Sequence, residues 1–359
     1  EGVMEFLLVN HPLDCPICDQ AGECDLQDQA FIYGRDGSRL KEEKRAVEEK
    51  SMGPFIKTHM TRCIHCTRCV RFMEDVAGTC EIGAFGRGNE MEIATFLSGG
   101  IKSELSGNII DLCPVGALTA KPYAMSYRPW ELAKTNSIDV FDSLGSAISV
   151  QSKSNEVVRI LPRINEEINE EWLSDKSRFA CDGLLTQRLD SCYIKNSSGK
   201  LVPASFKEAY EYIKSNLSKI NLSKEFAALT GFFTDAETVY GLKDLMNKIG
   251  SPYTESRPSE YHIEIEKREN YLFNSKIVGV EEADFILIIN SDIKKEAPVL
   301  NARIRRNVVA RKVPVYYIGA DVDLGIKVKN LGNNIETLNK IKELCPELEG
   351  SKKPMMISG

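Results

Sequence analysis

The spacing of apolar residues changes along the chain, and each change predicts a different kind of secondary structure. Among the first nine residues, Val3, Phe6 and Leu7 recur at helical spacing, so this segment is predicted to form a helix. Pro12 follows and cannot continue a helix. His11 is therefore expected at the exit of this first helix.

Short β-type runs replace the helical pattern in the middle of the chain. Residues 147–150 and 157–161 are rich in β-branched side chains, and Gly145 and Pro162 punctuate their ends. These runs predict a small β-rich domain.

The last part of the chain alternates between strand-like and helical patterns. The expected elements are a strand at 226–233, a helix at 236–249 that ends at Gly250, a buried strand at 283–290, a helix at 299–310 and a strand at 313–319. Such alternation predicts a parallel sheet with helices on both faces. Neither G-x-G-x-x-G nor G-x-x-x-x-G-K-[ST] occurs, so the alternation indicates a fold and not a nucleotide site.

Together these patterns predict three consecutive domains. An α+β cluster-binding domain is expected at residues 1–125, a small β-rich domain at 126–190, and an α/β parallel-sheet domain, truncated relative to a complete one, at 191–359. The mixed-charge run Arg39–Lys50 lies inside the first domain and is interpreted as a solvated connector.

Composition narrows the classes of function. The chain has 359 residues, of which 42% are hydrophobic and 27% charged, as expected for globular domains. A net charge of −6 gives no basic surface for nucleic acid, so we expect no nucleic-acid partner. The longest apolar runs are far shorter than the roughly 20 residues that span a bilayer. Any membrane contact is therefore expected only through partners.

Cysteine usage points to metal. Eight of the eleven cysteines fall within the first 113 residues, which in a chain of this length indicates metal binding in a reducing compartment and not a disulfide framework. Their spacing forms two candidate ligand sets, which are His11, Cys15, Cys18 and Cys24, and Cys63, Cys66, Cys69 and Cys113.

The second set follows the ferredoxin pattern. Cys-x2-Cys-x2-Cys lets one tight loop bind three corners of a 4Fe-4S cube while a distant Cys-Pro supplies the fourth ligand. Structural zinc is the alternative, but zinc sites usually take two separated cysteine pairs.

The remote ligand has two candidates, because Cys80 and Cys113 both start a Cys-x-x-Gly-Ala frame. Proline follows only Cys113, so we assign Cys113 as the ligand and expect Cys80 to be a buried, unligated thiol.

The first set contains a histidine, and its spacing favours a ligand role for that residue. A neutral imidazole in place of one thiolate removes a negative charge from the cluster, and a similar exchange raises the potential of Rieske centres.

The motifs around these ligands resemble a known family. Residues 11–28, 60–72 and 111–118 are similar to the large iron-sulfur subunit of respiratory complex I, the 75-kDa or G-type subunit, and the similarity continues through residues 128–132 and 159–172. The resemblance implies two 4Fe-4S clusters, one on each ligand set. It also implies that residues beyond 125 have the fold of molybdopterin oxidoreductases without binding molybdopterin.

The resemblance further implies a place in electron transfer. Electrons would pass from the flavin/NADH-binding subunit, through this chain, to peripheral-arm subunits with clusters nearer the membrane and finally to quinone. The chain would lie on the cytoplasmic face of the bacterial inner membrane or the matrix face of the mitochondrial inner membrane. It would carry no substrate active site of its own.

Two departures from the family pattern matter. Family members begin with a domain that carries a 2Fe-2S cluster, which is expected here only on a missing N-terminal domain. Some bacterial relatives carry an additional cluster, but between Thr135 and Gly183 this chain has only Cys181, so we predict two clusters and no third.

Two other classes of protein remain as alternatives. One is the iron-sulfur or catalytic subunit of an NAD-linked formate dehydrogenase or hydrogenase, for which neither Cys181 nor Cys192 has the context of a metal ligand. The other is a zinc-stabilised scaffold without redox activity. Four arginines flank the candidate clusters, namely Arg62, Arg68, Arg71 and Arg87. Their effect on the redox potentials of the clusters is left open, because solvent can screen their charges.

Overall fold

The computed structural model describes residues 1–96, 99–231, 233–256 and 266–359. Its contacts divide the chain into two compact units, residues 1–184 with 275–359, and residues 185–274. The segment 191–359, which the sequence groups into one α/β domain, thus contributes to both units. Within the described ranges, no helix has the length and apolarity required to cross a bilayer.

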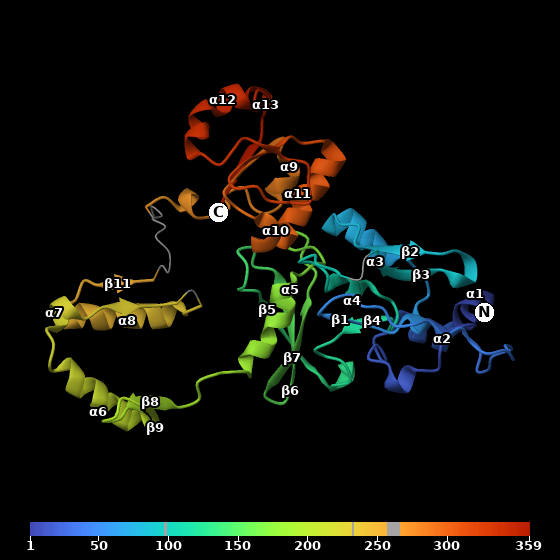
Figure 1. The fold of residues 1–359 in the computed structure, drawn as a ribbon, viewed down its shortest axis with the longest axis horizontal. Coiled ribbons are helices and arrows are strands. Elements are labelled where there is room, and N and C mark those ends of the chain that lie inside the picture. The colour runs from blue at the N-terminus through green and yellow to red at the C-terminus, as the bar shows by residue number, and fades with distance from the viewer. Residues whose placement is uncertain (97–98, 232, 257–265) are drawn as a thin grey trace. The chain divides into compact units, whose positions relative to one another are not determined.

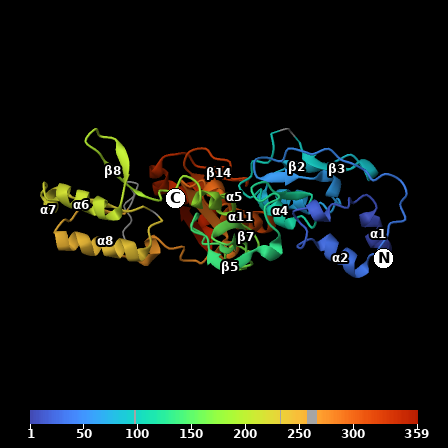
Figure 2. The ribbon, with the colours of Figure 1, turned by 90° about the horizontal axis from the view of Figure 1, so that it is seen from below.

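The first part of unit 1 is built from short helices and two small antiparallel sheets. Strands β1 and β4 pair with each other, as do β2 and β3. In both Figure 1 and Figure 2, the β2–β3 hairpin lies at the top of this part of unit 1 and α2 lies at its bottom. The elements are α1 (Gly2–Leu8), η1 (Cys15–Ile17), α2 (Asp25–Tyr33), β1 (Ile56–Thr58), η2 (Met60–Arg62), α3 (Arg68–Arg71), the π-helix η3 (Phe72–Ala77), β2 (Ile82–Phe85), η4 (Gly88–Glu90), β3 (Glu92–Thr95), α4 (Asn108–Leu112) and β4 (Leu118–Ala120).

The predicted first helix is present as α1, and His11 follows it. Its buried residue is Met4, whereas Val3 and Phe6 are exposed. The connector Arg39–Lys50 is not simply solvated, because Lys44 donates a 3.1 Å hydrogen bond to the carbonyl of Leu8. A connector tied in this way helps to fix the segment that leads to the first ligand set.

A three-stranded antiparallel sheet follows in unit 1, and it contains both predicted β-type runs. Ile148, Ile160 and Leu173 form its core, because alternate residues of β6 and β7 face the segment that leads to α5. The elements are η5 (Pro129–Glu131), β5 (Ala133–Ile138), β6 (Ala147–Lys153), β7 (Glu156–Pro162), α5 (Asp175–Phe179) and η6 (Ala180–Leu184).

The end of the chain completes unit 1 with a four-stranded parallel sheet in the order β14-β13-β12-β15. Helices η8, α12 and α13 pack on one face, while Ile286 and Ile288 of β12 point to the opposite face, where α9 and α11 lie (Figure 1). This arrangement confirms the predicted parallel sheet. The elements are α9 (Gly279–Glu282), β12 (Phe285–Ile289), α10 (Ile293–Glu296), α11 (Pro298–Arg311), β13 (Val315–Ile318), β14 (Lys329–Asn330), η8 (Ile335–Lys340), α12 (Ile341–Leu344), α13 (Glu347–Gly350) and β15 (Pro354–Ser358).

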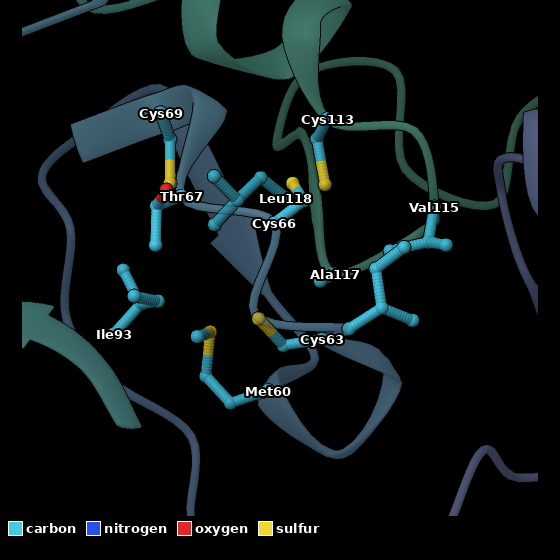
Figure 3. A pocket seen from close by; sticks show the side chains of 11 residues that line it. Met60, Cys63, Cys66, Thr67, Cys69, Ile93, Cys113, Val115, Ala117 and Leu118 are labelled. Carbon is cyan, nitrogen blue, oxygen red and sulfur yellow. The ribbon is translucent and has the colours of Figure 1, made fainter. Parts of the chain in front are cut away.

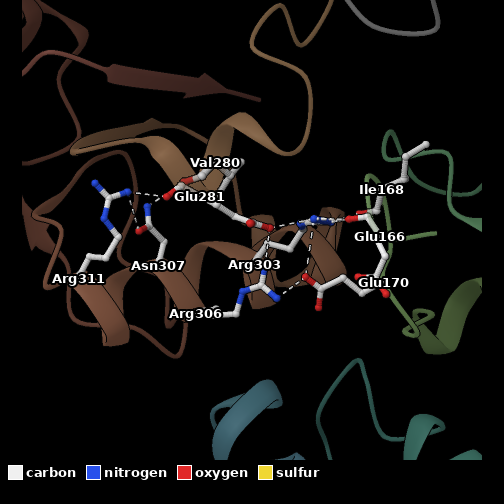
Figure 4. Close-up of polar contacts among 9 residues, drawn as sticks. All are labelled: Glu166, Ile168, Glu170, Val280, Glu281, Arg303, Arg306, Asn307 and Arg311. Atoms are coloured by element: carbon white, nitrogen blue, oxygen red, sulfur yellow. Dashed lines mark hydrogen bonds and ion pairs between the residues drawn. The ribbon is translucent and has the colours of Figure 1, made fainter. Parts of the chain in front are cut away.

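Arg303 of α11 attaches this sheet to the segment after β7 (Figure 4). Its guanidinium is buried and donates to the carbonyls of Glu166 and Ile168 at 3.0 and 2.9 Å, and to the carboxylate of Glu281 at 2.9 Å. Since a buried charge is costly unless it is paired, these bonds fix how the two parts of unit 1 meet.

Unit 2 is smaller and has a hairpin, helices and a two-stranded parallel sheet. The predicted helix 236–249 is α8, whereas of the predicted strand 226–233 only two residues form β10 and position 232 lies outside the described residues. The elements are β8 (Cys192–Lys195), β9 (Leu201–Ala204), α6 (Phe206–Leu217), α7 (Leu222–Glu225), β10 (Ala228–Leu229), α8 (Ala236–Ile249), β11 (Thr254–Glu255) and η7 (Arg268–Asn270).

Candidate metal centres

The four cysteines of the second set line one cavity (Figure 3). Cys63 follows η2, Cys66 lies in the next loop, Cys69 is in α3 and Cys113 ends α4. The cavity contains about 360 Å³ of space without protein atoms, part of it open to solvent, and the rest of its wall is apolar apart from Thr67.

The loop of the second set is shaped by unusual backbone conformations. His65 and Thr67 have positive φ angles of 54° and 59°, which non-glycine residues rarely adopt. These turns bring the backbone N–H of His65 to within 3.4 Å of the sulfur of Cys63. Strain of this kind persists where the surrounding structure enforces it, and here it points three cysteines of one loop into a single cavity.

The thiols of this set are costly to ionise without a bound cation. Burial raises the pKa of Cys69 to about 12, and the neighbouring thiolates of the set add to that rise. Burial likewise raises the pKa of Cys113 to about 11, although backbone N–H groups of Val115 and Leu118 oppose it. Metal ligation requires thiolates, and bound iron would supply the compensating positive charge. The donor set therefore fits an iron-sulfur cluster.

Cys80 lies elsewhere. It is exposed, contrary to the expected buried thiol, and it does not line the cavity that Cys113 lines. The reason is local, because Gly78 ends the π-helix η3 in a left-handed conformation and the chain then turns at the surface before β2 begins. Although Cys80 and Cys113 share the Cys-x-x-Gly-Ala frame, the first is exposed and the second is buried.

The three cysteines of the first set also lie near one another. Cys24 caps α2, and the backbone N–H of Gln27 points to its sulfur at 3.4 Å. Burial raises the pKa of Cys24, and the charges of Cys18 and Cys15 contribute to the same rise. The cysteine spacing thus gives a local cluster of thiols at the start of α2.

Gly116 brings this first set close to the second. A Cβ atom at Gly116 would lie 2.1 Å from the sulfur of Cys18, so only glycine fits here. Since Gly116 follows Cys113 by three residues, the segment that carries a cysteine of the second set passes close to a cysteine of the first.

His11 has a ring nitrogen available for a metal. Its Nδ1 atom is buried without a hydrogen-bond partner, and burial together with the charge of Lys44 lowers the pKa of the imidazole. A neutral imidazole is the form that ligates metal. Lys44 also donates to the backbone carbonyl of His11 and so holds the residue after α1. Among the described residues, no group of three or more His, Cys, Asp or Glu side chains has the arrangement of a single-ion site.

Arginines from distant segments hold the ligand loops, a feature that the sequence did not reveal. Arg159 of β7 forms a two-bond ion pair with Glu23 at 2.8 Å for both bonds, and Arg128 donates to the carbonyl of Cys18 at 2.6 Å. Acidic residues beside the cysteines, such as Glu23, indicate in the sequence that basic partners exist. Which arginines pair with them could not be identified from one sequence.

The comparisons with known families agree with this architecture. Residues 1–39 match the NADH-ubiquinone oxidoreductase-G iron-sulfur binding region, and residues 53–119 the ferredoxin-like domain of NADH-quinone oxidoreductase subunit 3. Residues 132–182 match the NADH-ubiquinone oxidoreductase NDSU1/NuoG-like 4Fe-4S domain, although Cys181 is their only cysteine. Residues 188–359 match molybdopterin oxidoreductase.

Curated relatives match the whole chain. It is 50% identical to the mitochondrial NADH-ubiquinone oxidoreductase 78 kDa subunit of Neurospora crassa, 48% identical to the 75 kDa subunit of Reclinomonas americana and 50% identical to the G-type subunit of the NADH-quinone oxidoreductase of Rickettsia felis. Each alignment covers 100% of this chain but 49%, 54% and 54% of the respective relative, so the chain spans about half the length of the relatives it matches.

A solved structure of an NAD+-reducing [NiFe]-hydrogenase in the H2-reduced state also aligns, with 25% identity over 35% of this chain and 55% of that one. Its TM-score of 0.32 is too low to support an argument.

The fold and the family matches define an iron-sulfur protein in which ferredoxin-like 4Fe-4S domains are joined to a molybdopterin-oxidoreductase-like domain. Its relatives at about 50% identity then identify it more closely. The chain belongs to the family of the 75-kDa, or G-type, subunit of NADH:quinone oxidoreductase.

Proposed function

We propose that this chain is an electron-transfer subunit of a proton-pumping NADH:quinone oxidoreductase and relays electrons through two 4Fe-4S clusters. The first cluster would be held by His11, Cys15, Cys18 and Cys24, and the second by Cys63, Cys66, Cys69 and Cys113. The convergence of four cysteines from two separate segments on one cavity is the observation that supports this proposal most strongly.

A 4Fe-4S cluster, when bound, supplies the redox chemistry, and the protein sets its position and surroundings. Backbone N–H groups of His65 and Gln27 point to the sulfurs of Cys63 and Cys24. Such bonds stabilise thiolate charge and favour the reduced cluster. Gly116 permits close approach of the two ligand segments, which electron transfer between the clusters requires.

The partners and location follow from the same proposal. Electrons would come from the flavin/NADH-binding subunit and leave to peripheral-arm subunits whose clusters lie nearer the membrane. The chain would bind neither NADH nor quinone. Its place would be peripheral, on the cytoplasmic face of a bacterial inner membrane or on the matrix face of the mitochondrial inner membrane.

The metal content of the anaerobically purified protein tests the proposal. We expect about eight irons per chain with matching acid-labile sulfide, and two reduced-cluster signals in low-temperature electron paramagnetic resonance after dithionite reduction. About two zinc ions without sulfide would instead identify a zinc-stabilised scaffold.

Paired substitutions test the remote ligand. We expect Cys113→Ala to lose the signal of the second cluster and about four irons, because it removes one of four ligands. Cys80→Ala is the control, since this exposed thiol lies outside the cavity. Loss of the second cluster in Cys80→Ala, with retention in Cys113→Ala, would show that the assignment is wrong.

A further inference from the structure

One buried arginine lies between the two candidate ligand sets. Arg62 ends η2 and directly precedes Cys63, and its side chain is only 3% exposed. Its Nε atom donates to the carboxylate of Asp14 at 2.8 Å, and Nη1 donates to the carbonyl of Gly116 at 3.4 Å. Asp14 directly precedes Cys15. A single guanidinium thus connects the side chain of Asp14, next to the first set, with the backbone of Gly116, close to Cys113 of the second.

The side chain of Arg62 also lies close to Cys18 of the first set. The Cβ position at Gly116 that is 2.1 Å from the sulfur of Cys18 is 3.7 Å from Cδ of Arg62. This geometry places the cation beside a cysteine of the histidine-containing set.

We propose that Arg62 and Asp14 form an electrostatic element shared by the two clusters, in which Arg62 favours the reduced state of both clusters and Asp14 opposes it. This inference rests on the proposed function, because it needs both clusters. An arginine remains protonated in proteins, so its charge is constant across the working pH range. Burial keeps that charge from being screened, unlike the surface arginines that flank clusters.

The chain provides a matched control for this pair. Arg68 precedes Cys69 and forms an ion pair with Asp25, which follows Cys24, at 3.5 Å. This second pair therefore also joins the two ligand segments beside a cysteine on each side. Its side chains are 47% and 68% exposed, so water and salt screen its charges.

The test is a redox titration of the cluster-loaded protein, monitored by electron paramagnetic resonance, with Arg62→Gln, Arg62→Lys, Asp14→Asn and Arg68→Gln. At a fixed ambient potential, we expect Arg62→Gln to lower the reduced-to-oxidised ratio by about tenfold, the order expected for a unit charge acting at the effective dielectric of a protein. Asp14→Asn should raise the ratio, Arg62→Lys should retain most of it, and Arg68→Gln should change it little.

Opposite shifts in Arg62→Gln and Asp14→Asn distinguish electrostatics from structural damage, since both changes break the same ion pair. Shifts in the same direction, or a shift in Arg62→Gln no larger than in Arg68→Gln, would overturn the inference. If Arg62→Gln fails to load clusters, Asp14→Asn decides, and an unshifted ratio there rejects the inference. The iron and sulfide content of the unmutated protein distinguishes failure of this inference from failure of the proposed function. If iron and sulfide are absent, the proposed function is overturned as well; if they are present, only the role of Arg62 and Asp14 is in question.

Discussion

Residues from the β-rich part of unit 1 hold the loop of the first ligand set. Arg159 contacts Glu23 with both terminal nitrogens, its Nε donates to Gln151 at 2.7 Å, and its guanidinium lies 4.5 Å from the ring centre of Tyr123. Side chains fixed by several partners make precise supports for a metal site. The β-rich part therefore acts on the cluster loop directly, although it supplies none of the proposed ligands.

Loss of this support should weaken the first cluster selectively. In Arg159→Gln the Glu23 carboxylate loses both bonds, so the loop that carries Cys24 is freer to move. We expect faster loss of the first cluster signal on exposure to air, by about tenfold as for other second-sphere changes, with the second signal retained. Lys153→Gln is the control, because its pair with Glu131 is more exposed. Equal loss rates in both variants would contradict the expectation.

A half-buried carboxyl group makes stability depend on pH. Asp142 lies between β5 and β6, and burial followed by the charge of Asp139 raises its pKa, although the N–H of Leu144 opposes the rise. Folded protein thus binds the Asp142 proton more tightly than unfolded protein does. The stability from this group is fully present below the unfolded pKa and is lost as pH rises through the folded pKa.

Asp142→Asn should therefore stabilise the protein at neutral pH. Asparagine can still accept the 3.0 Å bond from Leu144 and carries no charge to bury. We expect a melting temperature about 2 °C higher than that of the unmutated chain at pH 7, corresponding to ~1 kcal/mol. The difference should shrink at pH 4. A gain that is equal at both pH values would contradict the role of ionisation.

At the scale of elements, the sequence predicted long and well-bounded segments best. Helix α8 has the predicted limits because Asp235 caps its start and Gly250 ends it with a φ of 77°. The buried strand β12 was found from a run of apolar residues. By contrast, β10 is short because it pairs with only two residues of β11, and partners that are distant in sequence leave no mark in a local pattern.

The candidate site shows the same limit. The sequence predicts candidate ligands from their type and spacing, because three cysteines of each set lie within one short stretch of chain. The exposure of Cys80 could not, since it depends on the turn after η3. The pairing of Arg159 with Glu23 joins residues 136 positions apart, and only the fold brings them together.

The cap of α6 gives a test at the scale of one element. The hydroxyl of Ser205 accepts a hydrogen bond from the backbone N–H of Glu208 at 3.3 Å, and the Glu208 carboxylate accepts one from the backbone N–H of Ser205 at 2.8 Å, forming a capping box. Ser205→Ala should destabilise unit 2 by ~1 kcal/mol. Hydrogen exchange of the α6 amides should become about fivefold faster, whereas Ser218→Ala, at the opposite end of the helix, should have less effect. Unchanged exchange in Ser205→Ala would exclude a stabilising cap.

At the scale of the whole molecule, unit 1 joins parts that unit 2 separates in sequence. The segment before residue 185 contains every proposed ligand, and the segment after residue 274 contains the parallel sheet. Their connection includes Arg303, whose side chain is 2% exposed, and the backbone carbonyls of Glu166 and Ile168 (Figure 4). A charge network of this kind makes the attachment sensitive to a single substitution.

Arg303→Met should therefore separate the stability of the sheet from that of the clusters. Removing the guanidinium leaves the carbonyls of Glu166 and Ile168 without their donor and the Glu281 carboxylate with Arg306 alone, at a cost of ~3 kcal/mol. We expect the loss of sheet structure, followed by circular dichroism, to occur at a lower temperature than bleaching of the cluster absorbance, because no proposed ligand comes from the sheet. Arg311→Met is the matched control, since this exposed arginine of the same helix bonds to the backbone of Glu281. If the sheet and the clusters of Arg303→Met were lost at one temperature, and that temperature equalled the one measured for Arg311→Met, the sheet would be held to the cluster-bearing part by other contacts.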